Sequence, residues 1–403
     1  MTHGKTLLCA VLISGLSAAC SSGGTDNTGV AGTTGAGGTT GGAGTTGAAG
    51  TSGGAGTTGA AGTTGAAGTT GAAGTSALPT PTTLVTATGC TGIRMALAGS
   101  TIYYTDAAKG TVSSISTAGG TPTVIATAQK SPGAITADAN AVFFAINGTA
   151  PAEHGVMKIA LPAAAAPVVF IASESKTESA QKNENNVNAL LLSGTTLYVG
   201  RYTDVLKVSA TATAPATGTL IGRSPPDDNG KPAAFAADAT HVYQTEIDHL
   251  AVSRESNDGQ QNGLLGGSTT RVMYAPDRIA VSQGSLALDA IALGGGSVVW
   301  ANGTNIVTKA IGQAESVAIV PIANSAGFNT ITGFVISGST LYLGESLDNT
   351  VEKVAFPANP ATVTSPVEAV VIASGQKDPG QFLADATNIY WRTSDCKIQK
   401  LAK

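Results

Sequence analysis

The stretch "ADATNIYW", Ala384–Trp391, decides the fold because variants of it recur along the chain. Each copy places Asp, Ser or Gly in a short turn before a run of β-branched and aromatic residues. This pattern predicts a tight turn followed by a strand. The other copies read "AGSTIYY", "ADANAVFF", "LSGTTLYV", "ADATHVYQ", "LGGGSVVW" and "ISGSTLYL". Their central residues are Tyr103, Phe143, Tyr198, Tyr243, Val299, Tyr342 and Tyr390, spaced about 40 to 56 positions apart.

This spacing predicts an all-β fold, a seven-bladed β-propeller with four antiparallel strands in each blade, over residues 80–403. A second stretch, "TLVTATGC" (Thr83–Cys90), resembles the end of a blade that has no beginning. The missing strands are present at the other end of the chain as "QFLAD", "NIYW" and "KIQKLA". We therefore expect the two ends to share one blade, which closes the ring and removes open sheet edges.

The residues before this domain predict export and a tether. Residues 1–19 combine a weakly basic start with the apolar run "TLLCAVLISGL" and small residues, as in a signal peptide. The run is too short to span a membrane as a helix. Residues 20–79 repeat "GTTGAA" and offer no large apolar side chains for a core, so we expect a flexible linker.

The stretch "LSAAC" (Leu16–Cys20) resembles the lipobox of bacterial lipoproteins. The resemblance implies that Cys20 becomes lipidated and anchors the chain to a membrane, with Ser21 favouring the outer membrane. Lipoboxes prefer Leu where this chain has Ser17, and Ser17 with Ala19 also suits an ordinary signal peptidase. The domain resembles kelch, WD40 and NHL propellers, and the whole arrangement resembles tethered propeller lipoproteins of Gram-negative bacteria. The sequence motifs that define functions in those propeller families are absent from the sequence.

The charged residues, only 11% of the chain, fall mainly in the predicted loops between strands B and C and between blades. Loops on a rigid frame often carry function, so these loops form a candidate ligand-binding face. Its candidate residues are Glu153, His154, Arg201, Tyr202, Asp227, Asp228, Glu246, Asp248, His249 and Arg392. The net charge of -4 and the lack of a basic stripe argue against nucleic acid as a partner.

We expect a monomeric binding or scaffold domain for an extracellular or periplasmic protein or polysaccharide, with no cofactor and no metal. The alternative is a propeller enzyme, a metal-assisted lyase or a hydrolase acting on an extracellular polymer, in which His154, His249 and nearby carboxylates converge. No nucleophile or metal-binding motif supports this alternative. One interpretation of Asp138, Asp238 and Asp385 is a calcium site. However, aspartates in turns of this type form hydrogen bonds with their own backbone, which explains them without metal.

Four cysteines have separable roles. Cys9 lies in the predicted signal peptide and Cys20 is the predicted lipid site, which leaves Cys90 and Cys396. In an oxidising compartment these two predict one disulfide beside the closing blade. Two unpaired thiols are the other possibility.

Overall fold

The computed structural model describes residues 77–87, 92–150, 153–162, 165–172, 186–201, 204–223, 232–246, 251–256, 286–311, 317–323 and 330–403. They include a short 3-10 helix, η2 (Pro360–Thr362). The remaining elements of the described part are strands, as the sequence predicts. In chain order they are β1 (Thr82–Thr86), β2 (Arg94–Ala98), β3 (Thr101–Asp106), β4 (Thr111–Ser116), β5 (Thr123–Ala126), β6 (Pro132–Ala137), β7 (Ala141–Asn147), β8 (His154–Ala160), β9 (Val168–Ala172), β10 (Val187–Ser193), β11 (Thr196–Arg201), β12 (Asp204–Ser209), β13 (Thr219–Arg223), β14 (Pro232–Ala237), β15 (His241–Glu246), β16 (Ala251–Ser256), β17 (Leu286–Gly294), β18 (Ser297–Asn302), β19 (Asn305–Ala310), β20 (Val317–Ala323), β21 (Ile331–Ser337), β22 (Thr340–Glu345), β23 (Thr350–Ala355), β24 (Val367–Ala373), β25 (Gly380–Ala384), β26 (Asn388–Arg392) and β27 (Lys397–Ala402).

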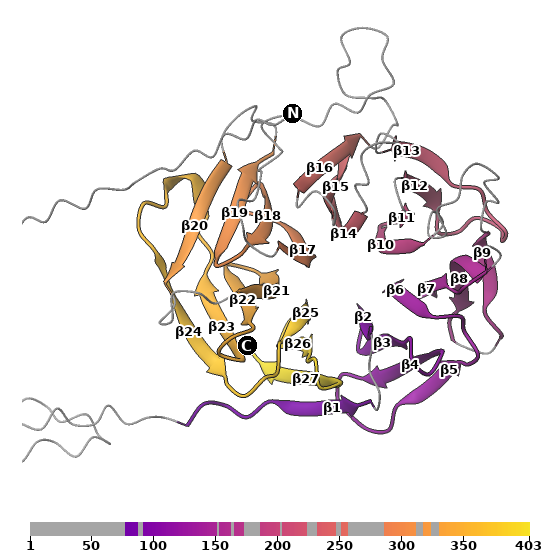
Figure 1. The fold of residues 1–403 in the computed structure, drawn as a ribbon, viewed down its shortest axis with the longest axis horizontal. Coiled ribbons are helices and arrows are strands. Elements are labelled where there is room, and N and C mark those ends of the chain that lie inside the picture. Colours follow the sequence, from indigo (N-terminus) through magenta and orange to yellow (C-terminus); the bar gives the residue numbers. More distant parts are fainter. Residues whose placement is uncertain are drawn as a thin grey trace, which may run out of the picture. The chain divides into compact units, whose positions relative to one another are not determined.

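The strands form antiparallel groups arranged around a centre, which is the propeller architecture that we predicted (Figure 1). These groups are compatible with seven blades, numbered here in chain order. Blade 1 is β2 to β5, blade 2 is β6 to β9, blade 3 is β10 to β13 and blade 4 is β14 to β16. Blade 5 is β17 to β20 and blade 6 is β21 to β24, and their outermost strands β20 and β24 pair in parallel. Blade 7 is β25 to β27 completed by β1.

Closure of the ring through both ends of the domain is confirmed. Strand β1 pairs antiparallel with β27, with Thr82 opposite Lys400 and Thr86 opposite Lys397. In Figure 1 the indigo strand β1 lies along the outer edge of the yellow strands. The backbone N–H of Ala87 donates to the carbonyl of Cys396 at 2.8 Å, which continues the contact beyond β1.

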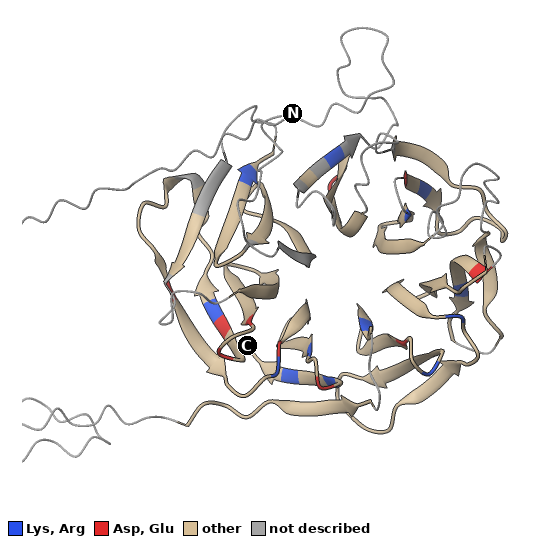
Figure 2. Cartoon of the chain, in the orientation of Figure 1, with Lys and Arg blue, Asp and Glu red and all other residues tan. Residues whose placement is uncertain are grey.

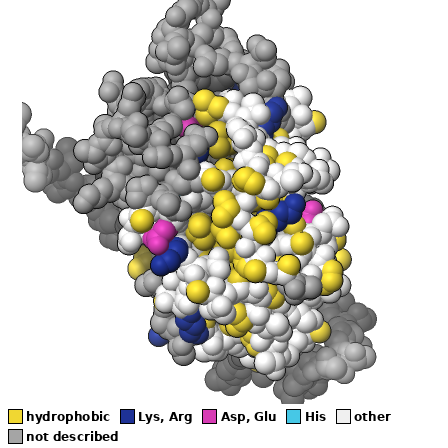
Figure 3. Space-filling view, turned by 90° about the vertical axis from the view of Figure 1, so that its right-hand side faces the viewer, with side chains coloured by type: hydrophobic (Ala, Val, Ile, Leu, Met, Phe, Trp, Pro, Cys, Tyr) yellow, Lys and Arg dark blue, Asp and Glu magenta, His cyan; other side chains and the backbone are white. Residues whose placement is uncertain are grey.

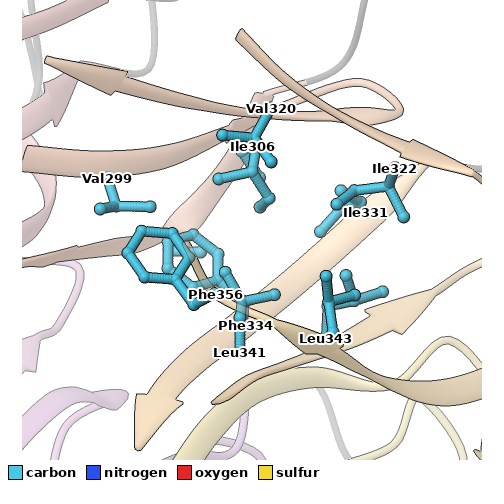
Figure 4. Close-up of a cluster of buried hydrophobic side chains, with 12 residues drawn as sticks. Val299, Ile306, Val320, Ile322, Ile331, Phe334, Leu341, Leu343 and Phe356 are labelled. Carbon is cyan, nitrogen blue, oxygen red and sulfur yellow. The ribbon is translucent and has the colours of Figure 1, made fainter. Parts of the chain in front are cut away.

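The second strand of each blade, strand B, is largely buried on both faces because it lies between two neighbouring blades. The burial of β3, β11 and β22 shows this, since each is buried at all but its first residue. The resulting clusters join adjacent blades. Val299, Val320, Phe334 and Leu341 belong to one such cluster between blades 5 and 6 (Figure 4).

The outermost strands have one face toward solvent. Val124 of β5, Val168 and Val169 of β9 and Leu220 of β13 are 53%, 49%, 45% and 41% exposed. Figure 3, which faces this side, shows scattered hydrophobic side chains and few charged ones. None of the described residues forms a helix long and apolar enough to cross a membrane.

Candidate functional site

The turns between the first and second strands of the blades, strands A and B, are stabilised in two ways. In blade 7, Asp385 Oδ1 accepts from the backbone N–H groups of Thr387 and Asn388, both at 2.7 Å. Asp238 makes the same two bonds in blade 4, and Asp138 makes equivalent bonds at 2.7 and 2.8 Å in blade 2. Other turns use glycine with positive φ, such as Gly194 at 58°. The turn role predicted for these three aspartates is confirmed.

Two of these aspartates also accept a tyrosine hydroxyl. Tyr390 donates to Asp385 Oδ2 at 2.6 Å, and Tyr243 donates to Asp238 Oδ2 at 2.7 Å. Burial alone would raise the pKa of Asp238, but the bonds from Tyr243, Thr240 and His241 outweigh it and lower that pKa to about 2. Burial and the bond to Asp385 raise the pKa of Tyr390 to about 12. The carboxylates of Asp238 and Asp385 therefore have a structural role in these turns.

The loops between strands B and C and the loops between blades gather charges, and several of the described charges are paired locally. The pairs are Lys109 with Asp106 at 3.6 Å, Lys130 with Glu153 at 3.3 Å, Arg201 with Asp204 at 3.7 Å and Lys397 with Asp395 at 2.8 Å. In the first two pairs the lysine is more exposed than its acidic partner. The side chains of Lys109 and Lys130 are 47% and 61% exposed, whereas those of Asp106 and Glu153 are 3% and 28% exposed. This face thus presents lysines to solvent above acidic partners at the ends of the strands.

The candidate residues of this face fall into four groups. Glu153 lies in its loop, where N–H groups of Ala150 and Thr149 and the Lys130 ammonium lower its pKa. His154 and Arg201 are buried, at 5% and 7% exposure, so neither is a solvated loop side chain. Arg392 ends β26 beside Gly380, and Glu246 is the last residue of β15. Tyr202, Asp227, Asp228, Asp248 and His249 lie outside the described residues, so the complete face stays a prediction.

A cavity of about 480 Å³ occupies the centre of the ring between the innermost strands. Small and apolar residues of β2, β6, β10, β14, β21 and β25 form most of its lining, together with Arg94, Thr136, Asn188 and Gln381. Arg94 is the one ionisable side chain in this described lining. Figure 2 shows the same distribution, because β6, β10, β21 and β25 carry neither blue nor red.

Polar side chains, one of them in the channel lining, connect neighbouring blades. Gln381 of blade 7 donates from Nε2 to the Met95 carbonyl at 2.9 Å and accepts from the Met95 N–H at 3.0 Å. Asn147 makes the corresponding pair of bonds to Val187, at 3.0 and 2.9 Å. These amides replace backbone pairing where two blades meet, so they stabilise the ring.

Blade 6 contains a pair of buried carboxyl groups that we did not predict. Glu345 ends β22 at 0% exposure, and Glu352 of β23 is 6% exposed. Burial first, and then the charge of Glu345, raises the pKa of Glu352 to about 7. Thr350 donates to Glu352 Oε1 at 3.4 Å, while Oε2 has no hydrogen-bond partner. Within the described ranges, no group of three His, Cys, Asp or Glu side chains could hold a metal.

Of the two cysteines predicted to form a disulfide, Cys396 lies within the described residues. Cys396 lies in the loop between β26 and β27 and packs against the cluster that contains Leu84, Ala87 and Tyr390. Its place in the B-to-C loop of the closing blade is as predicted. Cys90 and the proposed lipid site Cys20 lie outside the described residues.

Comparison with solved structures supports the class of fold. Virginiamycin B lyase from Staphylococcus aureus matches with a TM-score of 0.55 and 14% identity, over 80% of this chain and 98% of that one. A catalytically inactive variant of the same lyase with quinupristin matches with a TM-score of 0.54 and 12% identity, over 79% and 98%. A chain of the mitotic checkpoint complex also scores 0.54, at 12% identity over 80% and 94%. No protein-family model and no curated protein matches the sequence. At these identities the likeness shows the β-propeller fold alone.

Proposed function

We propose that the chain is a tethered β-propeller in which the face formed by the B-to-C loops and the loops between blades binds a protein or polysaccharide ligand outside the cytoplasm. The contrast between this face and the central channel carries the proposal. The face presents Lys109 and Lys130 to solvent, whereas the described channel lining contains Arg94 as its one ionisable group. Recognition needs charged groups on a rigid frame, while acid–base chemistry needs titratable groups that converge.

The proposed anchor follows from the N-terminal sequence. Lipidation at Cys20 and a linker over residues 20–79 hold the domain near the outer membrane as a monomer. Two or more acyl chains anchor a protein stably, and a Gly-rich linker of this kind has an average span of about 40 Å. Labelling cells with an alkyne-bearing fatty acid tests the anchor. The wild-type chain gains the label and Cys20→Ala does not, whereas an unlabelled wild-type chain would contradict lipidation.

We also propose that Cys90 and Cys396 form a disulfide at the seam of blade 7. The hydrogen bond from Ala87 to Cys396 at 2.8 Å supports it, since Ala87 precedes Cys90 by only three positions.

Ligand binding is tested with the full-length chain in detergent micelles on glycan and protein arrays. The double variant Lys109→Gln and Lys130→Gln removes the two exposed lysines of the face. Lys353→Gln, an exposed lysine within β23, is the matched control. We expect binding to weaken in the double variant and to persist in the control. Equal binding by all three proteins would contradict the assignment of this face.

An enzymatic function is the second candidate, favoured by one observation. His154 is buried, and its Nδ1 has no hydrogen-bond partner. One of the similar structures is a lyase, virginiamycin B lyase. An enzyme would release modified product from a bound polymer and lose this turnover in His154→Gln, while a binding domain would release the ligand unchanged.

A further inference from the structure

The innermost strand of most blades, strand A, contains a β-bulge close to its first residue. In blades 2, 3, 4, 6 and 7 the pairing of strand A with strand B skips at least one residue there. Strand A follows the loop between blades, so these bulges lie at the end of the central channel nearest the proposed ligand-binding face. A bulge changes the direction of the side chain of its extra residue. The extra residues, each second or third in its strand, include Ala134, Asn188, Ala233, Thr332 and Gln381.

The polar bulge residues of blades 6 and 7 form hydrogen bonds toward the next blade. Thr332 donates to the carbonyl of Pro379, which directly precedes the first strand of blade 7. Gln381 bonds both the N–H and the carbonyl of Met95 in blade 1. Asn188 holds the equivalent position in blade 3, but its side-chain amide forms no hydrogen bond within the described residues. Asn188 lines the central cavity instead.

The bulge residues of the blades on both sides of Asn188 are alanines. Ala134 of blade 2 and Ala233 of blade 4 also line the cavity and are half-buried. Their methyl groups leave space beside the amide of Asn188, which a larger side chain would fill. This amide offers one acceptor oxygen and two N–H donors. It can therefore bond a polar group of a molecule in the cavity.

Farther along the channel, toward the turns between strands A and B, the described lining is mainly apolar. Its leucines are Leu97 of β2, Leu190, Leu191 and Leu192 of β10 and Leu383 of β25. They pack against the clusters between blades but stay only half-buried, and part of each one borders the cavity. Covering this apolar surface with an apolar ligand is favourable, because it removes the surface from water.

The charge and size of the cavity define the class of ligand further. Arg94 is the one ionisable group of the described lining, and it already interacts within the chain, so the site favours an uncharged ligand. The cavity volume of about 480 Å³ is within the range of about 300 to 1,000 Å³ that is usual for small-molecule sites. Such sites combine apolar walls with a few polar groups, as this channel does.

We propose that the central channel binds an uncharged amphipathic molecule, with its polar head on Asn188 and its apolar body against the leucines of β2, β10 and β25. In Figure 1 these three strands lie around the centre of the ring. A primary amide head suits Asn188, since it can donate to Oδ1 and accept from Nδ2. A carboxylate can only accept, so it would leave Oδ1 unpaired. The site uses no loop residue of the face proposed above, so its test does not depend on a protein or polysaccharide ligand.

The test uses the full-length chain with Cys20→Ala, which removes the proposed lipid site, so that no detergent is present to take up apolar probes. The fluorescent probe is N-phenyl-1-naphthylamine, which is uncharged and apolar. Octanamide and octanoate compete with it and differ only in the charge of the head. Asn188→Leu removes the amide at similar volume, and Ala233→Leu fills the space beside it. Asn140→Leu is the matched control, since Asn140 is exposed in the turn between β6 and β7.

We expect saturable binding of the probe, and we expect octanamide to displace it at a concentration about tenfold lower than octanoate, as one additional hydrogen bond predicts. Asn188→Leu should lose this preference, and Ala233→Leu should weaken binding of the probe about fivefold or more. Asn140→Leu should behave like the parent chain.

Three results would overturn the proposal: no saturable binding, equal displacement by octanamide and octanoate in the parent chain, or a preference for octanamide that survives in Asn188→Leu. Undiminished binding of the probe by folded Ala233→Leu would also overturn it, because the probe would then bind outside the channel. Thermal unfolding shows whether each variant is folded. If Ala233→Leu does not fold, the preference for octanamide and its loss in Asn188→Leu decide the outcome.

Discussion

Tyr390 Oη lies 2.6 Å from Asp385 Oδ2, so a side chain of strand B closes the turn that precedes its own strand. The other oxygen of the same carboxylate accepts the two backbone N–H groups of Thr387 and Asn388. One aspartate thus fixes both the hairpin turn and the aromatic side chain at the interface between blades. A network of this kind stabilises the turn only while every member is present.

Tyr390→Phe should lower the free energy of unfolding by about 1 to 2 kcal/mol, because a hydrogen bond to a carboxylate is lost in a partly buried site. Chemical denaturation measures the change. Tyr342→Phe is the control, since the turn of blade 6 has Gly338 and no aspartate. An equal cost in both variants would show that ring packing, not the bond to Asp385, accounts for the effect.

The pKa of about 2 at Asp238 predicts a specific acid response. Its folded pKa is below the usual 3.8, so its contribution to stability is complete above pH about 4 and is lost as the pH falls toward 2. After allowance for solvent screening, this contribution is on the order of 1 kcal/mol. The stability difference between the wild-type chain and Asp238→Asn should therefore shrink between pH 5 and 2.5. A difference that stays constant over this range would contradict the role of the charged carboxylate.

Glu352 predicts the opposite response. Its folded pKa of about 7 exceeds the usual 4.5, so its favourable contribution is complete below pH 4.5 and is lost as the pH rises through 7. Glu352→Gln should remove this dependence and should be more stable than the wild-type chain at pH 8 by about 2 kcal/mol. Denaturant titrations between pH 5 and 8 measure it, with Glu368→Gln as an exposed control. If Glu352→Gln lost stability at pH 8, an ionised Glu352 would be needed in the fold.

The sequence predicts the blades well because each turn and aromatic run is a local signal. The Asp385 turn and the pairing of β1 with β27 both follow from short stretches whose chemistry is decided by neighbours in the chain. The burial of His154 and Arg201 could not be predicted from the sequence, because the end of a strand and the start of a loop look alike in sequence. Glu352 was missed for a related reason, since strand alternation gives its face but not the burial of Glu345 beside it.

Lys158 of β8, which lies opposite Phe143 in blade 2, tests whether a basic side chain stabilises the contact with the next blade. Its ammonium donates to the Ala210 carbonyl at 2.8 Å and lies 5.3 Å and 5.1 Å from the ring centroids of Phe143 and Phe170. Lys158→Met keeps the aliphatic stem but removes these interactions, at an expected cost of about 1 to 2 kcal/mol. Thermal unfolding provides the comparison. Lys130→Met, at a 61% exposed side chain, should cost close to nothing, and equal losses would argue against the inter-blade contact.

The seam between β1 and β27 gives the last prediction, which rests on the proposed disulfide. A bond between Cys90 and Cys396 closes a loop of about 300 residues, and the chain-entropy model gives it at most about 5 kcal/mol. Cys90→Ser and Cys396→Ser should therefore lower the unfolding temperature by similar amounts, and the double variant should be no worse than either one. A reductant should lower the unfolding temperature of the wild-type chain only. Peptide mapping without reduction identifies the bond directly. Additive losses in the double variant would mean that the two cysteines stabilise the seam separately, as unpaired side chains.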